Sequence, residues 1–196
     1  MPDNKNKVKF GLKNVHYAIA TIAADGSATF EVPKPIPGAV SLAMSPSGDR
    51  STFYADNIAY WEGTRNNGYE GTLEMALIPD DFREDALGEY VDSNGVYSED
   101  VDAEQKHFAL LFQFEGDASE TLHVIYKCLA TRPDVASGTT TETTEPVTET
   151  LNLSATPIYV SERGKWFVKA RTSKDTPAAT KTAWFTSVYV PGVAAV

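Results

Sequence analysis

One short helix signal stands in a sequence whose other regular segments alternate between apolar and polar residues. Pro79 cannot donate to a sheet ladder, so it closes the alternating run of residues 69–78. Asp80 can cap the backbone N–H groups that follow, and Gly88 suits the left-handed position just past a helix. The pattern predicts a helix over residues 80–87 in a chain built otherwise of strands.

Short alternating runs bounded by turn residues recur along the chain and predict about nine or ten strands. The two most apolar runs, residues 107–115 and 121–130, are expected to form the central hairpin of the core. We therefore expect a mainly β fold, an antiparallel β-sandwich or barrel flanked by one short α-helix. Asn66-Asn67-Gly68 is interpreted as a turn. Further strands are predicted over residues 15–22, 28–32, 39–44, 69–78, 147–155, 157–160, 165–171 and 182–190.

The 196 residues are expected to form a single domain, 1–196, because all-β domains of this length are common. Four segments are expected to stand apart from its core. Residues 1–14 are polar and predict an N-terminal arm, and residues 191–196 form a small apolar tail. Loop-forming residues predict a projecting loop over about 45–57, and the Thr-rich stretch 137–146 is expected to be a flexible loop.

The chain is acidic, with 17 Lys and Arg against 27 Asp and Glu and a formal charge of −10. This argues against a protein that grips nucleic acid through its phosphates, although a surface that lets a polyanion slide past would be built this way. Solubility alone is the other explanation. No apolar run is long enough to predict a membrane span, and the N-terminus lacks the apolar stretch of a secretory signal. The single cysteine, Cys128, predicts a buried, inert thiol and synthesis in a reducing cytoplasm.

No catalytic motif is present, and the sequence predicts no catalytic, cofactor-binding or metal-binding residues. His16, His107 and His123 lie in strand-like runs and are interpreted as ordinary strand residues. The segment Asp92–Gly95 lacks the spacing of a calcium-binding loop. Two alternatives stay open: a hydrolase with paired carboxylates, and a carbohydrate-binding or adhesion β-sandwich in which Trp61, Trp166 and Trp184 line a sugar groove.

Four phrases taken in order resemble the major tail protein, or tail tube subunit, of long non-contractile-tailed bacteriophages. They are the segment 54–60, the strand–Pro–helix passage 71–88, the hairpin 108–130 and the segment 145–151. The resemblance implies a non-enzymatic virion protein whose hexameric rings stack into a tube that conducts double-stranded DNA without binding it specifically. It also implies partners in the tail terminator, tape measure and distal tail proteins. The chain ends too soon for the additional immunoglobulin-like domain that some relatives carry.

On this interpretation the aromatic segment that follows residue 50 is the expected contact between subunits. Aromatic side chains dominate the energetics of many interfaces, and projecting segments can reach into neighbouring copies. The acidic excess would then line a channel that repels phosphate. The residues predicted to mediate assembly are Phe53, Tyr54, Asp56, Asn57, Tyr60 and Trp61.

Overall fold

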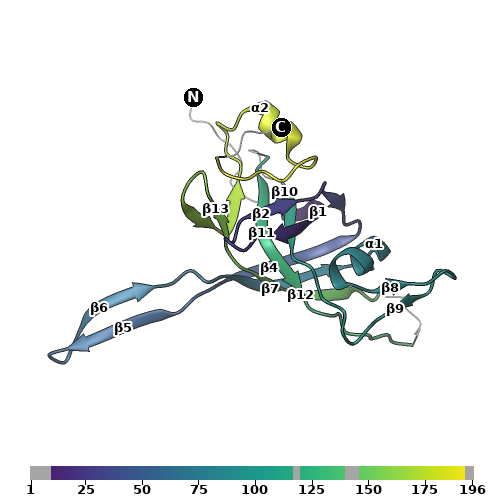
Figure 1. Cartoon of the computed structure of the whole chain (residues 1–196), viewed down its shortest axis with the longest axis horizontal. Coiled ribbons are helices and arrows are strands. Elements are labelled where there is room, and N and C mark those ends of the chain that lie inside the picture. Colours follow the sequence, from purple (N-terminus) through teal and green to yellow (C-terminus); the bar gives the residue numbers. More distant parts are fainter. Residues whose placement is uncertain (1–9, 117–119, 140–145, 193–196) are drawn as a thin grey trace.

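The strands form one large antiparallel sheet and three two-stranded sheets (Figure 1). The structure is a computed structural model that describes residues 10–116, 120–139 and 146–192. The order of the large sheet is β2-β1-β10-β11-β12-β7-β4, with β15 paired to β11 and β3 paired to β1. Its strands are β1 (Phe10–Ile22), β2 (Ala28–Phe30), β3 (Lys34–Pro35), β4 (Ala39–Ser47), β7 (Gly68–Met75), β10 (Phe108–Glu115), β11 (Leu122–Ala130), β12 (Glu149–Ala155) and β15 (Lys169–Arg171). The small sheets pair β5 (Arg50–Ala55) with β6 (Ile58–Thr64), β8 (Tyr90–Val91) with β9 (Tyr97–Ser98), and β13 (Ile158–Val160) with β14 (Lys165–Phe167).

The prediction of a mainly β, antiparallel fold is confirmed, but the described strands form no closed barrel. The sheet curves until β4 contacts β1, yet its hydrogen-bonded path ends at β2 and β4. Only the two residues of β3 pair with β1 in this region, Pro35 opposite His16 and Lys34 opposite Tyr17. Because prolines at 33, 35 and 37 lack the N–H donor that a ladder needs, this link cannot join β4 to β1 along its length.

The predicted central hairpin is confirmed as β10 and β11, which pair antiparallel in the middle of the sheet. Both strands are apolar on both faces because each face of the sheet carries a core. Phe108, Leu110 and Phe112 point into a first core together with residues of β1, β7 and β12. The alternate residues Ala109 and Leu111 point into a second core on the opposite face. Burial on both faces explains why this segment reads as a continuous apolar run.

The predicted helix over residues 80–87 is confirmed as α1 (Asp80–Phe82) followed without a break by the π-helix η1 (Arg83–Leu87). Gly88 ends it at φ 78°, in the left-handed conformation expected from the sequence. Asp80 is not the capping residue: Pro79 takes that position and no side chain caps the helix. Phe82 is fully buried and meets the rings of Tyr17 and Phe108 edge-on, at centroid distances of 4.9 and 5.2 Å. The helix therefore closes one end of the first core.

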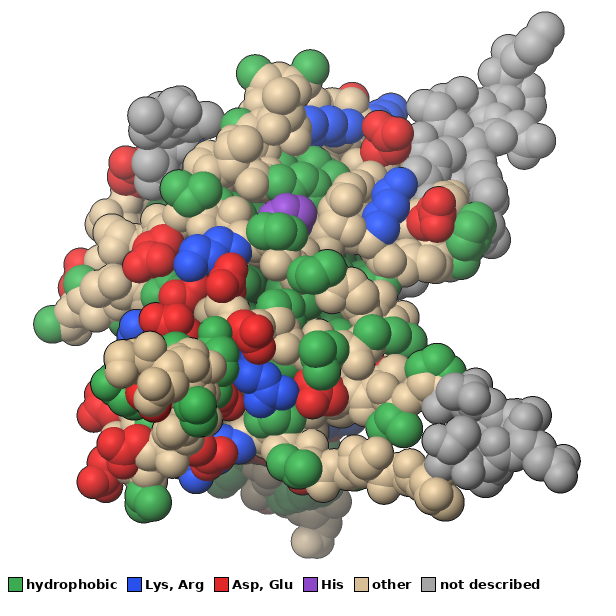
Figure 2. Space-filling model, turned by 90° about the vertical axis from the view of Figure 1, so that its right-hand side faces the viewer, with side chains coloured by type: hydrophobic (Ala, Val, Ile, Leu, Met, Phe, Trp, Pro, Cys, Tyr) green, Lys and Arg blue, Asp and Glu red, His purple; other side chains and the backbone are tan. Residues whose placement is uncertain are grey.

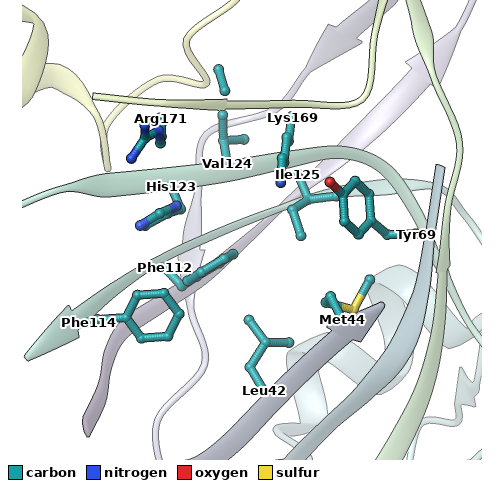
Figure 3. A pocket seen from close by; sticks show the side chains of 11 residues that line it. Leu42, Met44, Tyr69, Phe112, Phe114, His123, Val124, Ile125, Lys169 and Arg171 are labelled. Atoms are coloured by element: carbon teal, nitrogen blue, oxygen red, sulfur yellow. The ribbon is translucent and has the colours of Figure 1, made fainter. Parts of the chain in front are cut away.

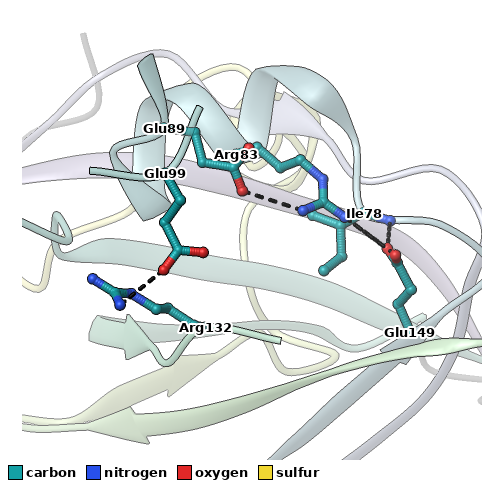
Figure 4. A network of polar contacts seen from close by, with 6 residues as sticks. All are labelled: Ile78, Arg83, Glu89, Glu99, Arg132 and Glu149. Atoms are coloured by element: carbon teal, nitrogen blue, oxygen red, sulfur yellow. Dashed lines mark hydrogen bonds and ion pairs between the residues drawn. The ribbon is translucent and has the colours of Figure 1, made fainter. Parts of the chain in front are cut away.

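Charged side chains fix this helix to the strands beside it. The Glu149 carboxylate accepts hydrogen bonds from the Ile78 backbone N–H at 2.7 Å and from Arg83 at 3.1 and 3.2 Å, and Arg83 also pairs with Glu89 (Figure 4).

On the other side of the helix, Asp85 accepts hydrogen bonds from Tyr17 Oη at 2.8 Å and from Lys34 Nζ at 2.5 Å. Burial disfavours the Asp85 charge, but the hydrogen bonds from Lys34 and Tyr17 outweigh it and lower the pKa of the carboxyl.

The strand predicted over residues 182–190 is wrong. The structure has a second short helix, α2 (Ala178–Ala183), and an irregular segment after it. Trp184 is buried against the second core, donates its indole N–H to the His123 carbonyl at 3.2 Å and stacks on Tyr189. The Tyr189 carbonyl in turn accepts a hydrogen bond from Tyr126 Oη at 2.8 Å. Contacts of Trp184 and Tyr189 with the second core, and not a strand ladder, decide the conformation of this segment.

Three further expectations differ from the structure. The strand predicted over 165–171 is divided between β14 and β15, which pair with different partners. Residues 10–14 of the predicted N-terminal arm belong to β1. The rest of that arm, residues 1–9, lies outside the described chain. The same holds for residues 193–196 of the predicted tail and 140–145 of the Thr-rich loop. At Asn66-Asn67-Gly68 the chain does not reverse but passes directly from β6 into β7.

Cys128 is fully buried, as predicted, in the first core. Burial disfavours the thiolate and raises the pKa of this thiol to about 12. At neutral pH the native protein therefore presents no reactive thiol at this position.

Candidate assembly surfaces

The β5–β6 hairpin, residues 50–64, projects from the body of the molecule and is called the arm below (Figure 1). It continues the two strands β4 and β7, because the Asn67 N–H donates to the Ser47 carbonyl at 2.9 Å and the Arg65 N–H donates to the Asp49 carbonyl at 3.0 Å. Gly48 permits this close passage: a Cβ atom there would lie 1.9 Å from the Arg65 carbonyl oxygen. The arm is thus a hydrogen-bonded continuation of the sheet where the sequence predicts a projecting loop over 45–57.

Asp56 and Asn57 form the tip of the arm. Both have positive φ angles, 52° and 61°, which is the pair of conformations that a type I′ hairpin turn requires. Asn and Asp tolerate this region better than other residues that carry a Cβ atom. The Asp-Asn pair between two strand-like runs is the sequence signal that could have predicted a hairpin here instead of a loop.

The register of the hairpin gives the arm one apolar and one polar face. Phe53 lies opposite Trp61 and Ala55 lies opposite Ile58, and because side chains alternate along each strand these residues share a face. The Trp61 ring lies over Gly63, where a Cβ atom would come within 2.3 Å of it. The other face carries Arg50, Thr52, Tyr54 and Glu62, with an ion pair between Arg50 and Glu62. Tyr60 lies at a register shift in β6: Trp61 pairs with Phe53 and Ala59 with Tyr54, so Tyr60 has no partner in β5.

Nothing in the described chain covers the apolar face of the arm. Phe53, Ile58 and Trp61 are 60%, 61% and 57% exposed, and β5 and β6 pair only with each other. An isolated two-stranded hairpin is at best marginally stable in water, and large exposed apolar patches mark interaction sites. The arm therefore has the composition of a segment that another surface covers.

The residues predicted to mediate assembly all lie on the arm, but the structure divides them. Phe53 and Trp61 share the apolar face, Tyr54 lies on the opposite face, Asp56 and Asn57 form the tip turn and Tyr60 sits at the bulge. Sequence reasoning missed Ile58, which lies on the apolar face next to the tip. The sequence signal for it is its position directly after the Asp56-Asn57 pair, and the structure places it opposite Ala55.

A second surface is the outer face of β4, β7 and β12, called the polar strip below. Glu74 accepts hydrogen bonds from Thr148 at 2.6 Å and from Ser41 at 2.8 Å, and these lower the pKa of its carboxyl. Glu70 accepts a hydrogen bond from Ser47 at 3.2 Å. No Lys or Arg occurs in these three strands. The strip comprises Ser41, Ala43, Ser45, Glu70, Thr72, Glu74, Thr150, Asn152 and Ser154.

The acidic stretch 80–104 contains the helix and the β8–β9 hairpin. Figure 2 views the side of the molecule that bears these elements and shows Asp and Glu side chains gathered over the lower half of that face. Glu99 pairs with Arg132 at 2.8 Å (Figure 4), and Asp92 accepts hydrogen bonds from the backbone N–H groups of Asn94 and Val96. Among the described residues, no group of three or more His, Cys, Asp or Glu side chains could hold a metal ion.

Of the three tryptophans considered for sugar binding, Trp184 is buried in the second core, and the other two lie on different small sheets. Trp61 is on β6, and Trp166 is on β14, where it is 59% exposed and packs beside Tyr159 at a centroid distance of 5.4 Å. Carbohydrate binding would therefore have to use one of them without the other.

Within the described part of the chain, no helix is long and apolar enough to cross a membrane.

Comparison with known proteins gave only distant likenesses, all among solved structures. No protein-family model matches the chain, and no curated protein matches it. Among solved structures, the chain is similar to a component of the cryo-EM structure of the anti-feeding prophage baseplate, determined with six-fold symmetry. The TM-score is 0.46 at 10% sequence identity, and the alignment covers 86% of this chain and 97% of the other.

Proposed function

We propose that this chain is a structural protein of a virion whose copies assemble into rings that stack into a tail tube. The observation that carries the proposal is the arm, a projecting hairpin with an uncovered face of Phe53, Ile58 and Trp61. An arm of this kind gains stability only when a partner covers it, and the chain itself can be that partner. The resemblance of the sequence to phage tail tube subunits favours self-assembly over attachment to an unrelated protein.

The arm favours a head-to-tail arrangement of copies. A projecting arm differs from the surface that would receive it, so the contact between copies is heterologous. Heterologous contacts produce rings when the rotation between neighbours closes, and rings that repeat along an axis produce a tube. Hexameric rings, and terminal partners such as the tail terminator, tape measure and distal tail proteins, follow from the family resemblance.

The polar strip suits the wall of a channel that conducts double-stranded DNA. Proteins that hold DNA do so mainly through Lys and Arg contacts to phosphate, and the strip has neither residue. Its charged groups are Glu70 and Glu74, whose hydrogen bonds to neighbouring hydroxyl groups hold them on the surface. A wall of small polar side chains and carboxylates repels the phosphates of DNA, and the DNA then passes without binding. No step of this role requires catalysis.

Negative-stain electron microscopy of the purified chain over a range of concentrations tests the proposal. We expect rings or tubes with a central channel, and we expect sedimentation velocity to show assembly that increases with concentration. A protein that stays monomeric at millimolar concentration would contradict the proposal. Binding to a glycan array that is lost in Trp166→Ala would favour the carbohydrate-binding alternative instead.

Replacing both Glu70 and Glu74 by Lys is expected to make the assembled protein retain double-stranded DNA. The substitutions exchange two negative charges for two positive ones on each copy, which converts a repelling wall into one that binds phosphate. Retention should fall steeply with salt concentration, as measured by co-sedimentation of labelled DNA with the assemblies. The control variant, Asp102→Lys with Glu104→Lys, makes the same change of net charge away from the strip. If both variants retain DNA equally, the strip does not line the channel.

A further inference from the structure

An apolar groove lies near the base of the arm, between the two sides of the curved sheet. Its volume is about 710 Å³, and Leu42, Met44 and Tyr69 of β4 and β7 face Phe112 and Ile125 of β10 and β11 across it (Figure 3). Phe112 and Ile125 belong to the first core, and Leu42, Met44 and Tyr69 pack against it. The groove is therefore the end of the first core that the helix α1–η1 does not close.

Two cations lie at the rim of this groove. Lys169 and Arg171 project from β15, and Figure 3 shows both beside the apolar lining. Lys169 Nζ lies 4.5 Å from the centre of the Tyr69 ring. Within the described chain neither side chain forms an ion pair with a carboxylate. The groove thus combines apolar walls with positive charge, and it suits a partner that carries an apolar face and an acidic end.

The arm has that composition. Its apolar face presents Phe53, Ile58 and Trp61, and its tip carries the exposed carboxylate of Asp56, which forms no ion pair in the described structure. The chain's own arm cannot fill its own groove, since the ladder from β4 and β7 carries β5 and β6 away from the body. A strand of 6 residues extends about 20 Å at ~3.3 Å per residue, enough to reach an adjacent copy.

We infer that the groove of each copy receives the arm of a second copy, with Phe53, Ile58 and Trp61 on the apolar lining and Asp56 beside Lys169 and Arg171. This inference rests on the proposed self-assembly and identifies the receiving surface. Because arm and groove are different surfaces of one chain, each copy donates one arm and receives another. The contact covers the apolar face of the arm and the open end of the core together.

Two complementary sets of variants test this pairing. The arm variant carries Phe53→Ser and Trp61→Ser and keeps an intact groove. The groove variant carries Met44→Glu, and a second groove variant, Lys169→Glu with Arg171→Glu, changes only exposed side chains and so spares the core. Val40→Glu, an exposed position on the same strand β4 but outside the groove lining, is the matched control. Folding of each variant is checked by its thermal unfolding transition.

Sedimentation velocity then reads the contact directly. Each arm or groove variant alone is expected to be monomeric, with self-association weakened by on the order of 30-fold or more, whereas Val40→Glu assembles like the native chain. An equimolar mixture of arm and groove variants should form a dimer and nothing larger, because one intact arm and one intact groove remain. If both groove variants assemble normally, or the mixture contains no dimer, the arm docks elsewhere and the inference fails while self-assembly stands. If the native chain is itself monomeric, the proposed function fails.

Discussion

A chain with serine in place of both Phe53 and Trp61 is expected to remain monomeric at concentrations at which the native chain assembles, without loss of stability. The two rings lie opposite each other on an arm that contributes no residue to either core. Exposed substitutions of this kind change the free energy of unfolding by about 0.5 kcal/mol or less. Aromatic anchors buried in an interface, in contrast, each contribute about 2 kcal/mol or more. Sedimentation velocity measures the loss of assembly, and urea denaturation measures the change in the free energy of unfolding.

The opposite face of the same arm supplies the control. Tyr54→Ser removes an aromatic ring of 68% exposure from the polar face and should leave assembly nearly native. Equal loss of assembly in Tyr54→Ser and in the double variant would mean that the arm is held along both faces. Normal assembly of the double variant would show that the apolar face is not the contact. A marked loss of stability would place the arm against its own body.

The arm shows what sequence reasoning could and could not reach. The concentration of large rings beside loop-forming residues is visible in the sequence, and the family resemblance is what assigns this segment to assembly. Its two faces could not be read, since the bulge at Tyr60 shifts the register between the strands and breaks the alternation on which the assignment of faces depends. The Asp56-Asn57 turn was readable in principle, because both residue types favour the left-handed conformations found there.

The groove and the polar strip lie beyond any local pattern. The groove gathers side chains from five strands, β4, β7, β10, β11 and β15, and their proximity depends on the order of the sheet. The central hairpin and the helix after Pro79 were predictable, because apolar continuity and a proline–glycine frame act over a few residues. The segment after Pro177 was not, because the burial of Trp184 by tertiary contacts decides its conformation.

Phe82→Ala is expected to lower the free energy of unfolding by about 3–5 kcal/mol, a large part of the ~5–15 kcal/mol that stabilises a typical domain. Phe82 has no exposed surface, and its ring is held edge-on between Tyr17 and Phe108. Removing the ring leaves a cavity under the helix. The ion pairs of Arg83 and Asp85 hold the helix in place, so the helix cannot move in to fill the cavity. Phe82→Leu, which keeps most of the volume, should cost less than about 1.5 kcal/mol.

Comparison of Phe82→Ala with the arm variant separates folding from assembly. At a temperature where Phe82→Ala is still folded, its arm and groove are intact and it should assemble like the native chain. The arm variant should show the reverse, a native unfolding transition without assembly. A loss of less than about 1 kcal/mol in Phe82→Ala would mean that the helix does not close the core. Loss of assembly by folded Phe82→Ala would mean that the contact between copies includes the helix, and the arm would then not suffice to join them.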